Sequence, residues 1–156
     1  MALVSKIGEV LELWSIPTDT RNQGKQIIPD IVQSIFENLD KNNLTTSDIL
    51  GIGMGSPGQI DYQHGTVCGA YNLGWDEIQE VRDQFEKEFS LPFLIENDAN
   101  VAALGERWKG AGEFLLTNVK KEFNRYAFPT VRRSTELKLA TLGNVAGVIG
   151  AASLLL

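Results

Sequence analysis

The chain contains a single cysteine, Cys68, and a single histidine, His64, among its 156 residues. One cysteine cannot form a disulfide within the chain, which fits the reducing cytoplasm and leads us to expect a cytoplasmic protein. Zinc sites of the usual kind need several Cys or His ligands, so this chain cannot build one from its own residues.

Basic residues are also few. The chain has 14 Lys and Arg against 20 Asp and Glu, for a net charge of −6. Nucleic acids and anionic membranes both favour clustered positive charge, so neither is expected as a partner. The N-terminus shows no basic region followed by an apolar run, and no signal peptide is predicted. The apolar stretch 145–156 is too short to span a bilayer and is expected to be a buried helix.

What remains is the alternation of apolar and polar residues typical of an α/β protein. Isoleucines recur every four positions from Ile27, which predicts an amphipathic helix. Asp76 is expected to cap a later helix whose inner face includes Ile78. The predicted order is hairpin, helix, strand, helix, strand, helix, with the strands central and parallel. These elements are expected at residues 3–16, 27–39, 49–54, 76–89, 92–95 and 97–108.

The pattern changes after Gly112. A helix is expected at 114–123, a strand near 137–139, and a final apolar helix after Gly143 and Asn144. This tail is too short to form a domain of its own. We therefore divide the chain into an α/β lobe, 1–112, and a helix-strand-helix remnant, 113–156.

Residues 53–58 read Gly-Met-Gly-Ser-Pro-Gly, which matches G-x-G-x-x-G. A dinucleotide site needs this motif to begin a helix, but Pro57 lies inside it and no helix start follows. We expect instead a loop at a strand end, where a bare backbone lets a ligand come close. A plain tight turn explains these residues equally well. Neither Gly55 nor Ser56 is expected to continue the strand.

Asp98 follows the predicted strand 92–95, where ligands of open α/β sheets gather. A carboxylate there can accept the proton of a bound hydroxyl, and the flanking Asn97 and Asn100 can orient neighbouring hydroxyls. Asp98 can equally serve as a cap for the helix that begins at Ala99. Spacing alone favours the cap.

Several segments taken together resemble the bacterial glucokinases of the ROK family. They are residues 52–58, the Asn-Leu-Gly-Trp segment at 72–75 and the Glu-Asn-Asp-Ala-Asn segment that opens 96–108. In the tail, residues 128–135 and 142–152 resemble the C-terminus of the same proteins. The resemblance implies a ribonuclease-H-like lobe of the actin/hexokinase type, with a mixed sheet flanked by helices, plus a C-terminal remnant of the second lobe.

The resemblance also implies a reaction and a set of site residues. The expected activity is ATP-dependent, Mg²⁺-assisted phosphorylation of glucose, or a related hexose, at the 6-hydroxyl. Asp98 would be the base that accepts the hydroxyl proton, and Asn97 would hold a ring hydroxyl. Ser56, Pro57 and Gly58 would lie against the sugar.

The chain departs from the family pattern in several places. It has no D-x-G-G-T phosphate strand, no second Gly-rich phosphate loop, no E-x-G-H element and no Cys/His zinc cluster. Residues 111–115 resemble a later family segment, which predicts an internal deletion near Gly112 together with N-terminal truncation. We expect a poor or inactive kinase with an uncovered sheet edge that favours self-association. The alternative is a non-catalytic sugar-binding or interaction fragment; ROK-type repressors, which are non-catalytic, carry a helix-turn-helix that is absent here.

Overall fold

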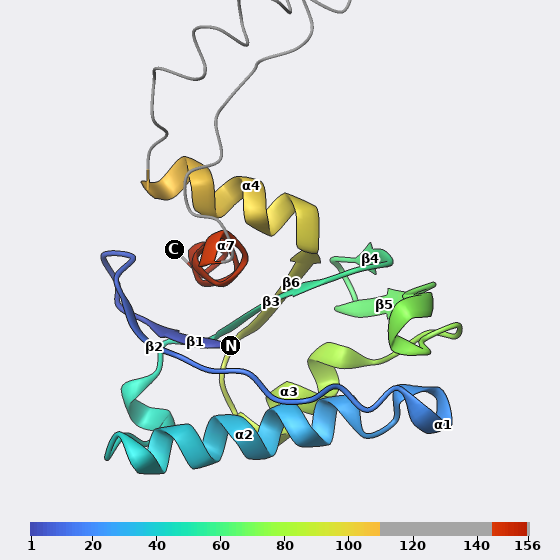
Figure 1. Cartoon of the computed structure of the whole chain (residues 1–156), viewed down its shortest axis with the longest axis horizontal. Helices are drawn as coiled ribbons and strands as arrows, with labels where there is room; N and C mark the ends of the chain where they lie inside the picture. Colours follow the sequence, from blue (N-terminus) through green and yellow to red (C-terminus); the bar gives the residue numbers. More distant parts are fainter. Residues whose placement is uncertain (110–144, 156) are drawn as a thin grey trace, which may run out of the picture.

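The computed structural model describes residues 1–109 and 145–155. Its main elements lie in three layers, with strands in the middle and helices on both sides (Figure 1). The strands of the middle layer are β1 (Ala2–Val4), β2 (Val10–Leu13), β3 (Ile52–Ser56) and β6 (Phe93–Asn97). The helices are α2 (Ile27–Lys41) and α3 (Val81–Phe89) on one side, and α4 (Asp98–Lys109) and α7 (Ala146–Ser153) on the other.

The strands pair in both orientations. β3 and β6 are parallel, with a register that runs from Ile52 opposite Phe93 to Ser56 opposite Asn97. β1 and β2 form the predicted antiparallel hairpin. A second antiparallel hairpin joins β4 (Gln59–Asp61) to β5 (Thr66–Cys68). Shorter elements are α1 (Arg21–Gly24) and the 3-10 turns η1 (Thr46–Asp48) and η2 (Tyr71–Leu73).

Helix α2 confirms the prediction made from isoleucine spacing. Ile27, Ile28 and Leu39 are buried on one face, because residues three and four apart share a side of a helix. Asp30 stands in the first turn and Lys41 in the last, each with the charge that complements the helix dipole. Burial of one face, with favourable charge at both ends, explains why this segment is the longest described helix.

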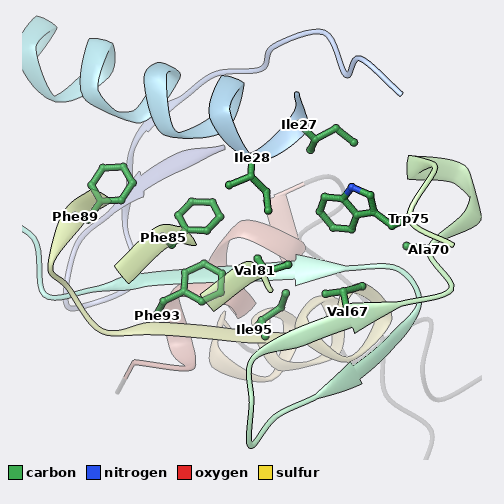
Figure 2. Packing of buried hydrophobic residues seen from close by; sticks show 10 residues of the cluster. All are labelled: Ile27, Ile28, Val67, Ala70, Trp75, Val81, Phe85, Phe89, Phe93 and Ile95. Carbon is green, nitrogen blue, oxygen red and sulfur yellow. The ribbon is translucent and has the colours of Figure 1, made fainter. Parts of the chain in front are cut away.

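The hydrophobic core lies between α2, α3 and the β3–β6 pair (Figure 2). Phe85 of α3 stacks on Phe93 of β6 with ring centroids 4.5 Å apart. Trp75 is 1% exposed, and its indole nitrogen donates to the carbonyl oxygen of Gly24 at 3.3 Å. The cluster comprises Ile27, Ile28, Val67, Ala70, Trp75, Val81, Phe85, Phe89, Phe93 and Ile95.

The start of α3 differs from the prediction. The helix begins at Val81, so Asp76 does not cap it, and Ile78 is 63% exposed. The reason is a backbone bridge between Gln79 and Val67, whose amides donate to each other's carbonyls at 2.8 and 3.1 Å. This pairing holds residue 79 extended beside β5, which prevents the helix from starting earlier.

The ends of the two parallel strands also correct the prediction. Gly55 and Ser56 continue β3, although we expected the strand to stop before them. They do so because β6 extends to Asn97 and supplies a partner for each of them, Glu96 for Gly55 and Asn97 for Ser56. Pairing with a neighbouring strand therefore overrides the weak strand propensity of glycine and serine.

The final apolar segment forms the predicted buried helix. Helix α7 packs on α4 and β3, with Ala146, Ile149, Gly150 and Ala151 buried. A Cβ atom on Gly150 would lie 1.5 Å from the carbonyl oxygen of Val101, so the backbones of the two helices are in direct contact. The predicted elements at 114–123 and 137–139, and the boundary after 112, lie outside the described residues. Across the described helices we find none with the length and apolar character of a membrane span.

The middle layer is interrupted between its two strand pairs. Within the described ranges, β1 pairs only with β2 and β3 only with β6. A cavity of about 650 Å³ lies there, with β1 and β3 in its wall. Helices α2 and α7 line it from opposite sides, through Ile31, Ile35, Leu39, Val148, Ala151 and Ala152. The cavity is therefore mainly apolar and is bounded by strand edges that have no partner strand in this part of the chain.

The contact between α4 and α7 predicts opposite effects at two glycines of one helix. Gly150→Ala should lower the free energy of unfolding by at least about 2 kcal/mol, because its methyl group would overlap the Val101 carbonyl. Gly147→Ala is the matched control, since a Cβ there meets nothing within 4 Å. It should be neutral or stabilise by up to about 1 kcal/mol through helix propensity. Urea unfolding measures both, and equal effects would contradict this packing.

A second pair of substitutions tests the α3 boundary. Phe85 is 1% exposed, so Phe85→Ala should cost about 3–5 kcal/mol of unfolding free energy. Ile78 is 63% exposed, so Ile78→Ala should change stability by no more than about 0.5 kcal/mol. Thermal denaturation followed by circular dichroism compares them. A large loss of stability in Ile78→Ala would instead support the longer helix predicted from the sequence.

Candidate active site

The carboxyl ends of β3 and β6 meet at one place. Ser56 and Asn97, the last residues of the two strands, are opposite each other in the parallel register. A Cβ atom on Gly55 would lie 3.4 Å from the Cα of Asp98, so the start of α4 is close beside the end of β3. The structure thus brings together the two segments that the sequence singled out, at the end of the strands where α/β proteins bind ligands.

Asp98 is exposed at the first position of α4. One of its carboxylate oxygens, Oδ1, accepts the amide proton of Ala99 at 2.8 Å. Asn97 Oδ1 accepts from the same amide at 3.1 Å. Asn97, two residues before that amide, thus makes the contact of an N-cap, whereas Asp98 lies in the first turn, where a carboxylate is favourable for the helix dipole. The second oxygen, Oδ2, has no hydrogen-bond partner among the described residues, so an exposed acceptor remains for a ligand hydroxyl.

The three residues of the Ser-Pro-Gly loop contribute differently. Ser56 is fully buried, and its hydroxyl donates to the carbonyl oxygen of Pro57 at 3.0 Å. Pro57 and Gly58 are half-buried. Because the Ser56 side chain is enclosed, what this loop offers to a ligand is the outer surface at Pro57 and Gly58.

Gly58 explains why the loop contains glycine. Its φ is +93°, and a Cβ there would lie 2.7 Å from the carbonyl oxygen of Cys68. Glycine is thus required at position 58 by the turn into β4 and by the close contact with β5. This agrees with the interpretation of the segment as a tight turn. Strand β4 begins at Gln59 directly after the motif, so no helix follows it. The dinucleotide interpretation of G-x-G-x-x-G is excluded, as predicted.

Glu96 is a member of the site that the sequence analysis did not single out. Its Oε1 accepts from the Tyr62 hydroxyl at 2.8 Å, the Asn97 amide at 2.6 Å and the Asn100 side-chain amide at 3.1 Å. Burial, the largest single influence, raises the pKa of Glu96, but the hydrogen bonds together leave that pKa below its usual value. Donation to Glu96 raises the pKa of Tyr62. The sequence carries no local signal for these contacts, because Glu96 lies in strand β6, before the helix that carries Asn100, and Tyr62 is distant in the chain.

The tip of the β4–β5 hairpin is held by charged side chains. Arg82 of α3 donates to the carbonyl oxygens of Tyr62 and Gln63, each at 2.8 Å. Asp61 and His64 form an exposed pair with 2.8 Å between Oδ2 and Nδ1. This pair raises the pKa of His64 and lowers the pKa of Asp61. The Asp61 carboxylate also accepts hydrogen bonds from the amides of residues 63 and 64. It therefore stabilises the turn of the hairpin.

The described residues do not form a metal site by themselves. Nowhere in residues 1–109 and 145–155 do three or more Cys, His, Asp or Glu side chains gather as metal ligands would. The large cavity reaches Asp98 and Gly55, but its walls are mainly apolar, and none of residues 56–58 or Asn97 lines it. It is a gap between the two strand pairs of the middle layer, whereas the polar groups suited to a sugar lie at the strand ends beside it.

Comparison with known proteins identifies the family. The sequence model of the ROK family matches residues 1–115. A glucokinase of Halalkalibacterium halodurans is 40% identical over 113 residues, which cover 72% of this chain and 34% of that protein. A xylose repressor of Caldicellulosiruptor bescii is 43% identical over 76 residues, 49% of this chain and 19% of the repressor.

A solved structure agrees with the sequence comparisons. The ROK family glucokinase from Streptomyces griseus, in complex with glucose and AMPPNP, matches with a TM-score of 0.58 and 29% identity. The match covers 71% of this chain and 33% of that one, so the chain spans about a third of the length of the glucokinases it resembles. The predicted α/β fold of the actin/hexokinase type is thereby confirmed. On both sequence and structure, the chain belongs to the ROK family.

Proposed function

We propose that this chain is the glucose-binding part of a glucokinase-type ROK protein, with Asp98 as the catalytic base. The observation that carries the proposal is the paired end of β3 and β6, which sets Asn97 opposite Ser56 and Asp98 beside Gly55. The matched glucokinases support the substrate class, and the Streptomyces griseus structure in complex with glucose supports the choice of sugar.

The proposed chemistry begins at the Asp98 carboxylate. Its Oδ2 takes the proton of the sugar 6-hydroxyl, while Oδ1 stays bonded to the Ala99 amide and keeps the group in place. The sugar oxygen then forms a bond to phosphorus as the bond to the leaving phosphate oxygen breaks. ATP with Mg²⁺ is proposed as the phosphoryl donor because of the family resemblance. Asn97 and the outer surface of Pro57 and Gly58 would orient the sugar ring.

We further propose that the 156-residue chain alone is a poor or inactive kinase. Stabilisation of phosphoryl transfer depends on backbone amides and cations placed around the phosphates. The sequence contains neither the D-x-G-G-T segment nor a second Gly-rich loop that would supply such amides. Positioning of the sugar is the part of the reaction that the described site can perform.

A second candidate function is sugar binding without catalysis. It is favoured by the matched xylose repressors, which show that the same part of the family sequence occurs in proteins named as repressors. In that case Asp98 and Asn97 would hold sugar hydroxyls through hydrogen bonds alone. Both functions predict that the chain binds sugar, and only the kinase function predicts turnover.

Two further properties belong to the proposal. We assign the chain to the cytoplasm, which fits its single cysteine. We also expect self-association, because β1 and β3 each pair with only one strand in the described ranges, and Leu11 and Leu13 of β2 are more than half exposed.

Binding and turnover are measured separately on the same chain. Titration of glucose into the protein by calorimetry should give heat, and adding ATP and Mg²⁺ should yield little or no glucose 6-phosphate. Asn97→Ala should weaken glucose binding about tenfold through loss of a polar contact, whereas Gln33→Ala, on the exposed face of α2, should not. Absence of heat would overturn the binding function, and turnover at ordinary kinase rates, about 1–100 s⁻¹, would overturn the predicted inactivity.

The role of Asp98 is tested with a sugar that lacks the reacting group. The wild-type chain should bind 6-deoxyglucose about tenfold more weakly than glucose, because a hydrogen bond to a charged acceptor is lost. In Asp98→Asn this preference should shrink, while unfolding free energy stays within about 0.5 kcal/mol because residue 98 is exposed and asparagine keeps an oxygen acceptor there. Any residual turnover should fall roughly 10²–10⁴-fold. An unchanged preference in Asp98→Asn would overturn the assignment of Asp98 as the group that binds the 6-hydroxyl.

A further inference from the structure

One oxygen atom of Glu96 connects the two halves of the candidate site. The first half is the β6–α4 junction, and Glu96 binds it twice, through the Asn97 amide and the Asn100 side chain. The second half is the loop 56–58, which continues directly into β4. Glu96 reaches that half through the hydroxyl of Tyr62, the residue after β4, at 2.8 Å.

Tyr62 is held at both ends. Its carbonyl oxygen accepts from Arg82 of α3, and its hydroxyl donates to Glu96 of β6. Tyr62 as a whole is 56% exposed, so burial does little to fix its position. Two polar contacts, one to a helix and one to a strand, therefore hold the tip of the hairpin, and through β4 they tie the loop 56–58 to β6.

We propose that Glu96 is a positioning residue that fixes the Ser-Pro-Gly loop relative to Asn97 and Asp98. The inference rests on the proposed function, since the two halves need a fixed spacing only if one ligand touches both. Glu96 itself lies one residue before Asn97 and acts through its neighbours. A carboxylate suits this role because one oxygen can accept several hydrogen bonds, and because bonds to a charged acceptor are stronger than neutral ones.

Four variants separate the contacts. Glu96→Ala removes all three bonds, and Glu96→Gln retains an oxygen at the same place without the charge. Tyr62→Phe removes only the tether to the hairpin. Tyr71→Phe is the matched control, because Tyr71 is 78% exposed and its hydroxyl makes no hydrogen bond in the described structure.

Amide hydrogen exchange, measured on the whole chain, tests whether the two halves are held in place, and it needs no ligand. Glu96→Ala should speed exchange at Asn97 and through residues 59–68 about tenfold or more. Tyr62→Phe should speed it in residues 59–68 alone, Glu96→Gln should restore most of the protection, and Tyr71→Phe should leave it unchanged. No change in Glu96→Ala would overturn the inference, as would faster exchange of equal size throughout the chain, which indicates general destabilisation.

Glucose titration distinguishes this inference from the proposed function. If the wild-type chain binds glucose, Glu96→Ala should bind it about tenfold more weakly and Glu96→Gln within a few-fold of wild type. Unchanged affinity in Glu96→Ala would overturn the positioning role. If the wild-type chain binds no glucose, the proposed function fails, and the exchange pattern alone decides whether Glu96 holds the two halves together.

Discussion

The parallel pairing of β3 with β6 is the constraint on which the rest of this structure depends. Five residue pairs fix the register, and both strands end together at Ser56 and Asn97. Phe93 and Ile95 of β6 are buried in the core against α2 and α3, so a one-residue slip would turn them away from this core. Packing of the core thus sets the register, and the register sets which polar residues share the strand ends.

Close packing on the other face adds a second restriction. Helix α7 lies against both α4 and β3, and its backbone touches that of α4 at Gly150. Because α4 begins with Asp98, any shift of this helix pair would move the candidate base. The hairpin β1–β2 is less restricted, since an apolar cavity of about 650 Å³ separates its edge from β3. The candidate site therefore lies where β3, β6 and α4 are in close contact, and Asp98 also borders the cavity.

The position of Asp98 in the first turn of α4 is compatible with the role of base that we propose for it. One oxygen of Asp98 bonds the Ala99 amide, which orients the group, while the other stays available to a ligand. Glu96 likewise uses one oxygen for several contacts, because its Oε1 accepts hydrogen bonds from both the β6–α4 junction and the hairpin. The matched relatives include proteins named as glucokinases and proteins named as xylose repressors, and hydroxyl recognition is what the two functions that we propose have in common. Transfer chemistry would require phosphate-binding elements beyond it.

The sequence by itself determined the types of the main described elements and singled out the segments that form the candidate site. Spacing of isoleucines predicted α2, and the motifs around Gly58 and Asp98 marked the strand ends, because periodicity and turn chemistry are local properties. Only the tertiary structure decided that β3 extends through Ser56, that Gln79 delays α3, and that Glu96 joins the halves of the site. Each of these depends on a partner distant in the chain, and a strand edge or a hydrogen-bond acceptor cannot be assigned until folding brings that partner beside it.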